Sequence, residues 1–249
     1  MNVRIQKLGI KQTIQKHWMD KTVQMMLSGA TEKEIRNDLD NYLSTQKASG
    51  GIGERGEKTY GLAISILAAW FAPEDNLIPL RDDALKLAHS ISMGKWLPLH
   101  WAVISASYPF WFNVALQSGR LFNLQERVTQ SQIFDRLKEQ YGDRETVARN
   151  ARYAVRSLIA WNVMCDTETR GCYAKVKPMS ITDVKTISLL LESALHTIPD
   201  SKVSFTTLLN NPAFFPFELP AITGDVSAQN NSRVKVERYS LNEEYLMLV

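Results

Sequence analysis

The sequence predicts a mainly α fold in three parts. A helical N-terminal body covers residues 1–95, a central unit of helices and one hairpin covers 96–178, and a small α/β C-terminal portion covers 179–249. Three observations support this prediction: apolar residues recur at helical spacing through most of the chain, a hairpin pattern follows the central helices, and the last residues alternate like strands. With 249 residues, 45% of them hydrophobic, the chain can bury a substantial core.

The N-terminal body is expected to contain four helices. The first covers residues 5–28, with a small basic face formed by Arg4, Lys7 and Lys11. The T-x-x-E pattern of Thr31–Glu34 is a capping box that opens the second. Two more are expected over 59–72, where Pro73 ends the helix, and over 82–93.

A glycine-rich segment separates the second and third of these helices. Gly51, Gly53 and Gly56 formally match the G-x-G-x-x-G dinucleotide fingerprint. That motif works after a strand and at the start of a helix, whereas here a polar helix precedes it. We therefore expect a loop rather than a phosphate cradle.

The central unit begins with an aromatic stretch of 21 residues, Trp96–Leu116, that contains no charged side chain. This is roughly the length of a membrane span. Pro98 and Pro109 interrupt it, and polar residues such as His100 and Asn113 would need partners in lipid. We expect a buried helical hairpin that leads into the following helices, and no membrane partner.

Two helices are expected next. The first, over 129–142, has Ile133, Phe134 and Leu137 on one side, and Gly142 is expected to end it in a left-handed conformation. Asp143 is then a candidate N-cap for the second helix, with Glu145 in its first turn.

The second helix carries two different faces. Its apolar stripe consists of Val147, Ala151, Ala154, Val155 and Leu158. Arg149, Arg152 and Arg156 recur at i, i+3 and i+7 on another face, with Tyr153 beside them. After Trp161 the pattern becomes β-like, with a tight tip at Asp166–Gly171 and with Lys175 and Lys177 on the returning strand.

Helix, turn, basic helix and hairpin is the order of a winged helix-turn-helix, whose second helix can enter the major groove of DNA. The central unit is therefore predicted to be such a module with its aromatic lead-in helices. Its candidate DNA contacts are Arg144, Arg149, Arg152, Tyr153 and Arg156 from the helix, and Arg170, Lys175 and Lys177 from the hairpin. Winged helices also serve as protein-docking modules, and that alternative stays open.

The charge distribution favours double-stranded DNA as the partner. Residues 120–177 hold eleven Lys and Arg against seven Asp and Glu, a net of +4, although the whole chain carries only +3. A local basic face is what phosphate binding needs. Residues 178–249 carry a net of −3, which suits contact with other proteins. They are expected to form a helix over 181–197, a packed segment with Phe214, Phe215 and Phe217, and two short strands.

No catalytic or metal-binding pattern is recognisable in the sequence. The four histidines are scattered, and His100 among aromatic residues is expected to be a core residue. Cys165 and Cys172 flank the hairpin tip without a nearby histidine, so a zinc site lacks ligands and reduced thiols are expected. The N-terminus lacks the continuous apolar run of a secretory signal. We expect a cytoplasmic, non-enzymatic protein without a cofactor.

The segment GDRETVARNARYAVRSLIAWNVM with its DTETRGCY hairpin, behind an N-terminal helical body, resembles the BrxA-like accessory proteins of bacterial phage-exclusion (BREX-type) islands. The resemblance covers residues 1–180. It implies a helical domain joined to a winged helix, and a non-catalytic DNA-binding subunit of a multi-protein antiviral defence system. Other subunits of that complex would be its partners, and the resemblance implies Arg149, Arg152 and Arg156 as DNA contacts.

Overall fold

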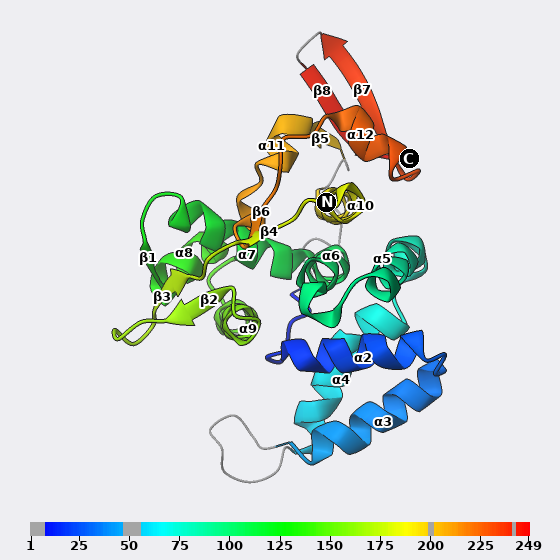
Figure 1. The fold of residues 1–249 in the computed structure, drawn as a ribbon. Helices are drawn as coiled ribbons and strands as arrows, with labels where there is room; N and C mark the ends of the chain where they lie inside the picture. The colour runs from blue at the N-terminus through cyan, green and yellow to red at the C-terminus, as the bar shows by residue number, and fades with distance from the viewer. Residues whose placement is uncertain (1–7, 47–55, 199–201, 241–242) are drawn as a thin grey trace.

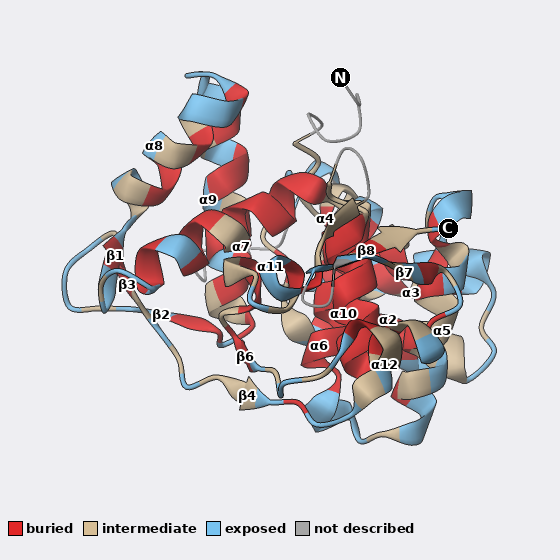
Figure 2. Ribbon diagram, turned by 90° about the horizontal axis from the view of Figure 1, so that it is seen from above, coloured by how far each residue is buried: buried red, intermediate tan, exposed pale blue. Residues whose placement is uncertain are grey.

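The computed structural model describes residues 8–46, 56–198, 202–240 and 243–249. The chain is mainly helical, and small sheets lie mostly toward its C-terminus (Figure 1). Buried side chains from all three predicted parts belong to one hydrophobic cluster. The most deeply buried helices lie at the centre of the molecule (Figure 2).

The N-terminal helices differ from the prediction mainly at their ends. The helix expected over 5–28 begins only at Lys16: α2 is Lys16–Leu27. Residues 8–15 are not helical, and the candidates Arg4 and Lys7 lie outside the described residues. Gly9 has φ +70°, a backbone conformation that does not occur in an α-helix. A Cβ at this position would also lie 2.6 Å from the Tyr108 ring, so the close approach of the chain to that ring requires glycine.

The capping box of the second helix is confirmed. Thr31 and Glu34 exchange the expected hydrogen bonds at the start of α3, Glu32–Ser44. Helix α4 is Glu57–Phe71, close to the predicted limits. Helix α5, Ile78–Ser90, starts four residues earlier than expected, after the 3₁₀ turn Asp75–Leu77, and a second turn, Met93–Lys95, follows it. Within the glycine motif only Gly56 is described, as the N-cap of α4.

The uncharged stretch forms two buried helices, α6 over Leu97–Ser107 and α7 over Pro109–Phe122. They divide at Pro109, as expected of a residue that cannot continue a helix. Trp101 packs edge-to-face on Trp111 with ring centroids 6.0 Å apart. No helix in the described parts of the chain is long and apolar enough to cross a membrane.

Helices α8, Gln130–Tyr141, and α9, Glu145–Ala160, follow. Around them lie the strands β1, Arg127–Thr129, β2, Met164–Asp166, and β3, Cys172–Lys175, in an antiparallel sheet of order β1-β3-β2. Gly142 has a positive φ of 84°, as predicted, but its ψ of 154° is extended rather than left-handed helical. The predicted N-cap was wrong. Arg144, not Asp143, precedes the first turn of α9, and its side chain caps no backbone N–H.

In the C-terminal portion, one helix packs on α6 and one short turn packs on α7, while the larger of two small sheets packs on the C-terminal helices and projects from the molecule (Figure 1). Helix α10, Val184–Leu195, begins three residues later than predicted because the Asp183 carboxylate accepts a hydrogen bond from Thr186 N at 2.8 Å. The remaining elements are β4 Met179–Ser180, β5 Lys202–Ser204, α11 Phe205–Leu209, the 3₁₀ turn Pro212–Phe214, β6 Phe217–Glu218, α12 Gly224–Gln229, β7 Val234–Ser240 and β8 Glu243–Leu248. Strands β4 and β6 pair in parallel, and the other sheet has the order β5-β8-β7.

The phenylalanine segment packs as predicted. Phe217 lies edge-to-face on Trp101 at 5.4 Å, and Phe214 lies on Phe112. A Cβ added to Gly119 of α7 would lie 1.8 Å from the backbone oxygen of Pro212. Glycine is therefore required where this segment crosses α7.

Candidate nucleic-acid interface

Helix α9 has one buried face and one exposed, positively charged face. All five residues of the predicted apolar stripe are buried. Arg149, Arg152 and Arg156 are exposed, and Tyr153 between them is half-buried and packs against the core. The helical spacing therefore predicted correctly which side chains of this helix reach solvent.

The N-terminal segment holds the inner side of α9 in place. Ile14 N donates a hydrogen bond to Ser157 Oγ at 2.9 Å, and Trp161 Nε1 donates one to Ile14 O at 3.0 Å. Both bonds are buried, so the non-helical segment 8–15 is fixed at Ile14 against the C-terminal end of α9. This contact links residues more than 140 positions apart and explains why the first helix starts later than its local pattern predicts.

Arg156 joins α9 to the hairpin. Its Nη1 donates to both carboxylate oxygens of Asp166 at 2.8 Å. Asp166 pairs with Tyr173 across the β2–β3 ladder, and Tyr173 OH donates to Gln130 Oε1 of α8 at 3.0 Å. Burial raises the pKa of Tyr173, so this hydroxyl stays protonated and keeps its donor role. The hairpin is thereby fixed beside the basic helix.

The other arginines of the helix are less constrained. Arg149 Nη1 lies 3.9 Å from a carboxylate oxygen of Glu145, a weak i,i+4 pair. Arg144 Nη2 donates to Tyr141 O at 2.8 Å. Arg152 has no hydrogen bond or ion pair within the described residues. Of the three predicted arginine contacts, Arg149 and Arg152 are thus the ones most free to bind another group.

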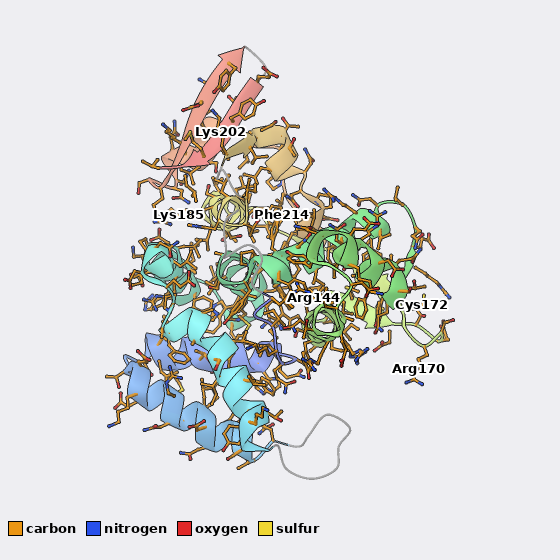
Figure 3. The ribbon with its side chains drawn as sticks, turned by 180° about the vertical axis from the view of Figure 1, so that it is seen from behind. Arg144, Arg170, Cys172, Lys185, Lys202 and Phe214 are labelled. Atoms are coloured by element: carbon orange, nitrogen blue, oxygen red, sulfur yellow. The ribbon has the colours of Figure 1, made fainter. Side chains whose placement is uncertain are left out.

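The hairpin tip mixes charges. The loop Thr167–Gly171 is closed by the bond from Thr167 N to Cys172 O, and Gly171 takes φ +74°. Arg170 is exposed and extends from this tip into solvent (Figure 3). Glu168 at the same tip lies 3.6 Å from Arg127 of β1. The tip therefore presents one cation, Arg170, and one acidic side chain, Glu168.

The two hairpin lysines do not share a strand. Both are exposed, but β3 ends at Lys175, and Lys177 follows it beside Pro178. The expectation that Lys177 belongs to the returning strand is therefore wrong. Lys175 lies opposite Met164, on the face of the sheet that also carries Asp166.

Sequence reasoning missed β1 and its contribution to this surface. Arg127 is exposed and lies opposite Ala174 of β3. A usable signal was present, because Thr129 and Gln132 form a capping box at the start of α8 and so require an extended residue before that helix. A three-residue strand is too short to be recognised by alternation alone.

Other candidate sites give no comparable arrangement. His100 is fully buried, its Nε2 lies 2.9 Å from Asp20 Oδ1, and burial lowers its pKa, so it is a neutral core residue as expected. Cys165 and Cys172 are both free thiols. Among the described residues, no three His, Cys, Asp or Glu side chains gather closely enough to hold a metal ion.

Comparison with known proteins adds no constraint: no protein-family model, no curated protein and no solved structure matches this chain.

Proposed function

We propose that α7, β1, α8, α9 and the β2–β3 hairpin form a winged helix-turn-helix, with α9 as the recognition helix and the hairpin as the wing. The element order and the strand order β1-β3-β2 support this assignment, as does the Arg156–Asp166 pair that holds the hairpin beside α9. A recognition helix has to be rigid on its inner side and accessible on its outer side. The buried stripe and the exposed arginines of α9 meet both requirements.

The proposed activity is binding of duplex DNA, chiefly through phosphate contacts. The observation that carries it is the exposed pair Arg149 and Arg152, neither of which is held by a close ion pair. Guanidinium groups bind phosphate oxygens and guanine edges with two parallel hydrogen bonds. Residues 120–177 supply the surrounding excess of positive charge. Arg170 and Lys175 would reach the flanking backbone from the wing.

The protein is further proposed to be a non-enzymatic subunit of a larger bacterial assembly for phage defence. This part rests on the resemblance to BrxA-like accessory proteins. The net charge of −3 over residues 178–249 supports it, because that portion suits contact with protein rather than DNA.

Fluorescence anisotropy with a labelled duplex tests the DNA-binding proposal. The double variant R149A/R152A should weaken binding by at least about tenfold, since each arginine–DNA interaction is worth about 1–3 kcal/mol. The slope of log K against log salt should flatten by about 0.9 for each phosphate that the variant no longer neutralises. The matched control is K33A/R36A, which removes two exposed cations from α3 and should leave binding unchanged.

Two results would contradict the proposal. If R149A/R152A and K33A/R36A weaken binding equally, only net charge matters and α9 is not the recognition helix. If the unaltered protein does not bind the duplex even at low salt, the result would favour the alternative that this module binds another protein.

A further inference from the structure

Strand β7 is the edge of a projecting sheet. In the order β5-β8-β7, it pairs only with β8 among the described residues. The β7–β8 hairpin extends beyond the neighbouring helices in two opposite views of the molecule (Figures 1 and 3). An edge strand of seven residues offers backbone donors and acceptors to another strand.

One hydrogen bond fixes which residues of β7 point outward. Val249 N donates to Arg233 O at 2.9 Å, so the backbone groups of residue 233 face β8. Backbone groups alternate sides along a strand, and the register pairs Lys235 with Met247 and Glu237 with Tyr245. Val236 and Arg238 therefore direct their N–H and C=O groups to the free edge. Outside the regular helices and strand ladders, no backbone bond among the described residues uses those groups.

The side chains beside this edge alternate in charge. Lys235 and Glu237 are two residues apart and share one face, with Lys235 Nζ 3.5 Å from a Glu237 oxygen. Glu237 also accepts a hydrogen bond from Lys202 at 2.6 Å. Val236 lies on the other face, toward Gly224 of α12. Along this edge a cation, Lys235, is followed by an apolar residue, Val236, and an anion, Glu237.

We propose that β7 pairs antiparallel with β7 of a second copy of this chain, with Val236 on the twofold axis. Val236 then exchanges both of its outward hydrogen bonds with Val236 of the partner. Lys235 lies opposite the partner's Glu237, and Glu237 lies opposite the partner's Lys235. The two sheets become one continuous six-stranded sheet across the dimer axis.

Charge complementarity selects both this partner and this register. An axis at Lys235 would place two lysines directly opposite each other, and an axis at Glu237 would place two glutamates opposite each other. Like charges in that position are destabilising, whereas opposite charges stabilise the pair. Because an interface restricted to one strand edge is small, we expect reversible association with a Kd on the order of micromolar.

Sedimentation velocity of the full chain over a concentration series tests the dimer. The unaltered protein should shift from monomer to dimer through the micromolar range. K235E and E237K should each weaken self-association by about tenfold or more, because each places like charges across the axis. An equimolar mixture of the two variants should form a heterodimer, because both cross-axis pairs then again join a lysine to a glutamate. K33E, which makes the same charge change on α3, should dimerise as the unaltered protein does.

Folding of each variant is checked by circular dichroism and thermal melting, since E237K also removes the acceptor of the bond from Lys202. If E237K does not fold, K235E decides alone, because Lys235 makes only one weak ion pair within the described residues. A monomer at all concentrations would overturn the proposal. So would a dimer that K235E leaves intact, or folded variants that fail to pair when mixed.

Discussion

Arg156 and Arg233 each bind a carboxylate with two hydrogen bonds, but they lie in opposite environments. Arg156 and Asp166 at the basic helix are each about half exposed, at 46% and 49% of their side-chain surface. Arg233, between α12 and β7, donates to both oxygens of Glu192 at 2.6 and 2.8 Å, and that glutamate side chain is fully buried. Arg233 also donates to Asp83 of α5 at 2.8 Å.

These two arginines differ in role: a buried ion pair stabilises the fold, whereas an exposed charged side chain can also bind a ligand. An exposed ion pair contributes at most about 1 kcal/mol to stability, because water solvates each partner when the pair opens. A buried carboxylate has no such alternative and depends on its partner. Arg233 is therefore committed to joining α5, α10 and the C-terminal sheet. Arg149 and Arg152 of α9 are exposed and lack a close ion pair among the described residues, so they remain accessible to a ligand.

The largest expected effect follows from breaking the buried pair. R233A should lower the free energy of unfolding by about 3–5 kcal/mol, because it leaves the Glu192 carboxylate buried without its main donor. R156A should lower it by no more than about 1 kcal/mol. Urea unfolding followed by circular dichroism measures both changes in unfolding free energy. Equal losses in R233A and R156A would contradict the distinction between the buried and the exposed ion pair.

Low pH should weaken the same buried ion pair between Glu192 and Arg233. Burial alone would raise the pKa of Glu192, but hydrogen bonds from Arg233, His196 and Asn231 hold it below its usual value. The carboxylate therefore stabilises the fold above its unfolded-state pKa of about 4.3, and the contribution is lost as pH falls through the lower folded-state pKa. Thermal melts between neutral and acid pH should show a steeper acid loss for the unaltered chain than for Glu192→Gln.

The wing lysines should give a smaller effect, on binding only. K175A/K177A should weaken binding to all duplex sequences about equally, and should flatten the salt slope by up to about two units if both lysines bind phosphates. Because Lys177 lies beyond β3, the single variants separate their contributions. Stability should be unchanged. Loss confined to one duplex sequence would instead mean that the wing reads bases.

The smallest effect should come from Asp166. D166N removes a negative charge from the proposed DNA-binding surface and releases Arg156, so DNA affinity should rise by about threefold, or roughly 0.7 kcal/mol. The same anisotropy assay measures it, with Glu32→Gln on α3 as the charge-matched control. Weaker binding by D166N would mean that the ion pair's role is to position the wing, and that this positioning outweighs the charge it removes.

The sequence by itself determined the features that depend on neighbours along the chain. The capping box at Thr31, the buried stripe of α9, the exposure of its arginines and the two C-terminal strands all follow from spacing within one element. Periodicity reports which side of an element faces the core, and this is a local property. All eight candidate DNA contacts were named from the sequence, and seven of them have exposed side chains in the structure.

Only the tertiary structure decided how those elements meet. Residues 8–15 are not helical, and Ser157 and Trp161 bind the backbone of Ile14 there, although the local pattern favours a helix. The partner of Arg156 is ten residues away on a strand, and Glu192 meets Arg233 from 41 residues away. Such pairs form where long-range packing brings two side chains together, and no periodicity along the chain encodes that distance. The arginines of α9 were therefore predictable as a basic face, while the division into paired and available cations came from the fold.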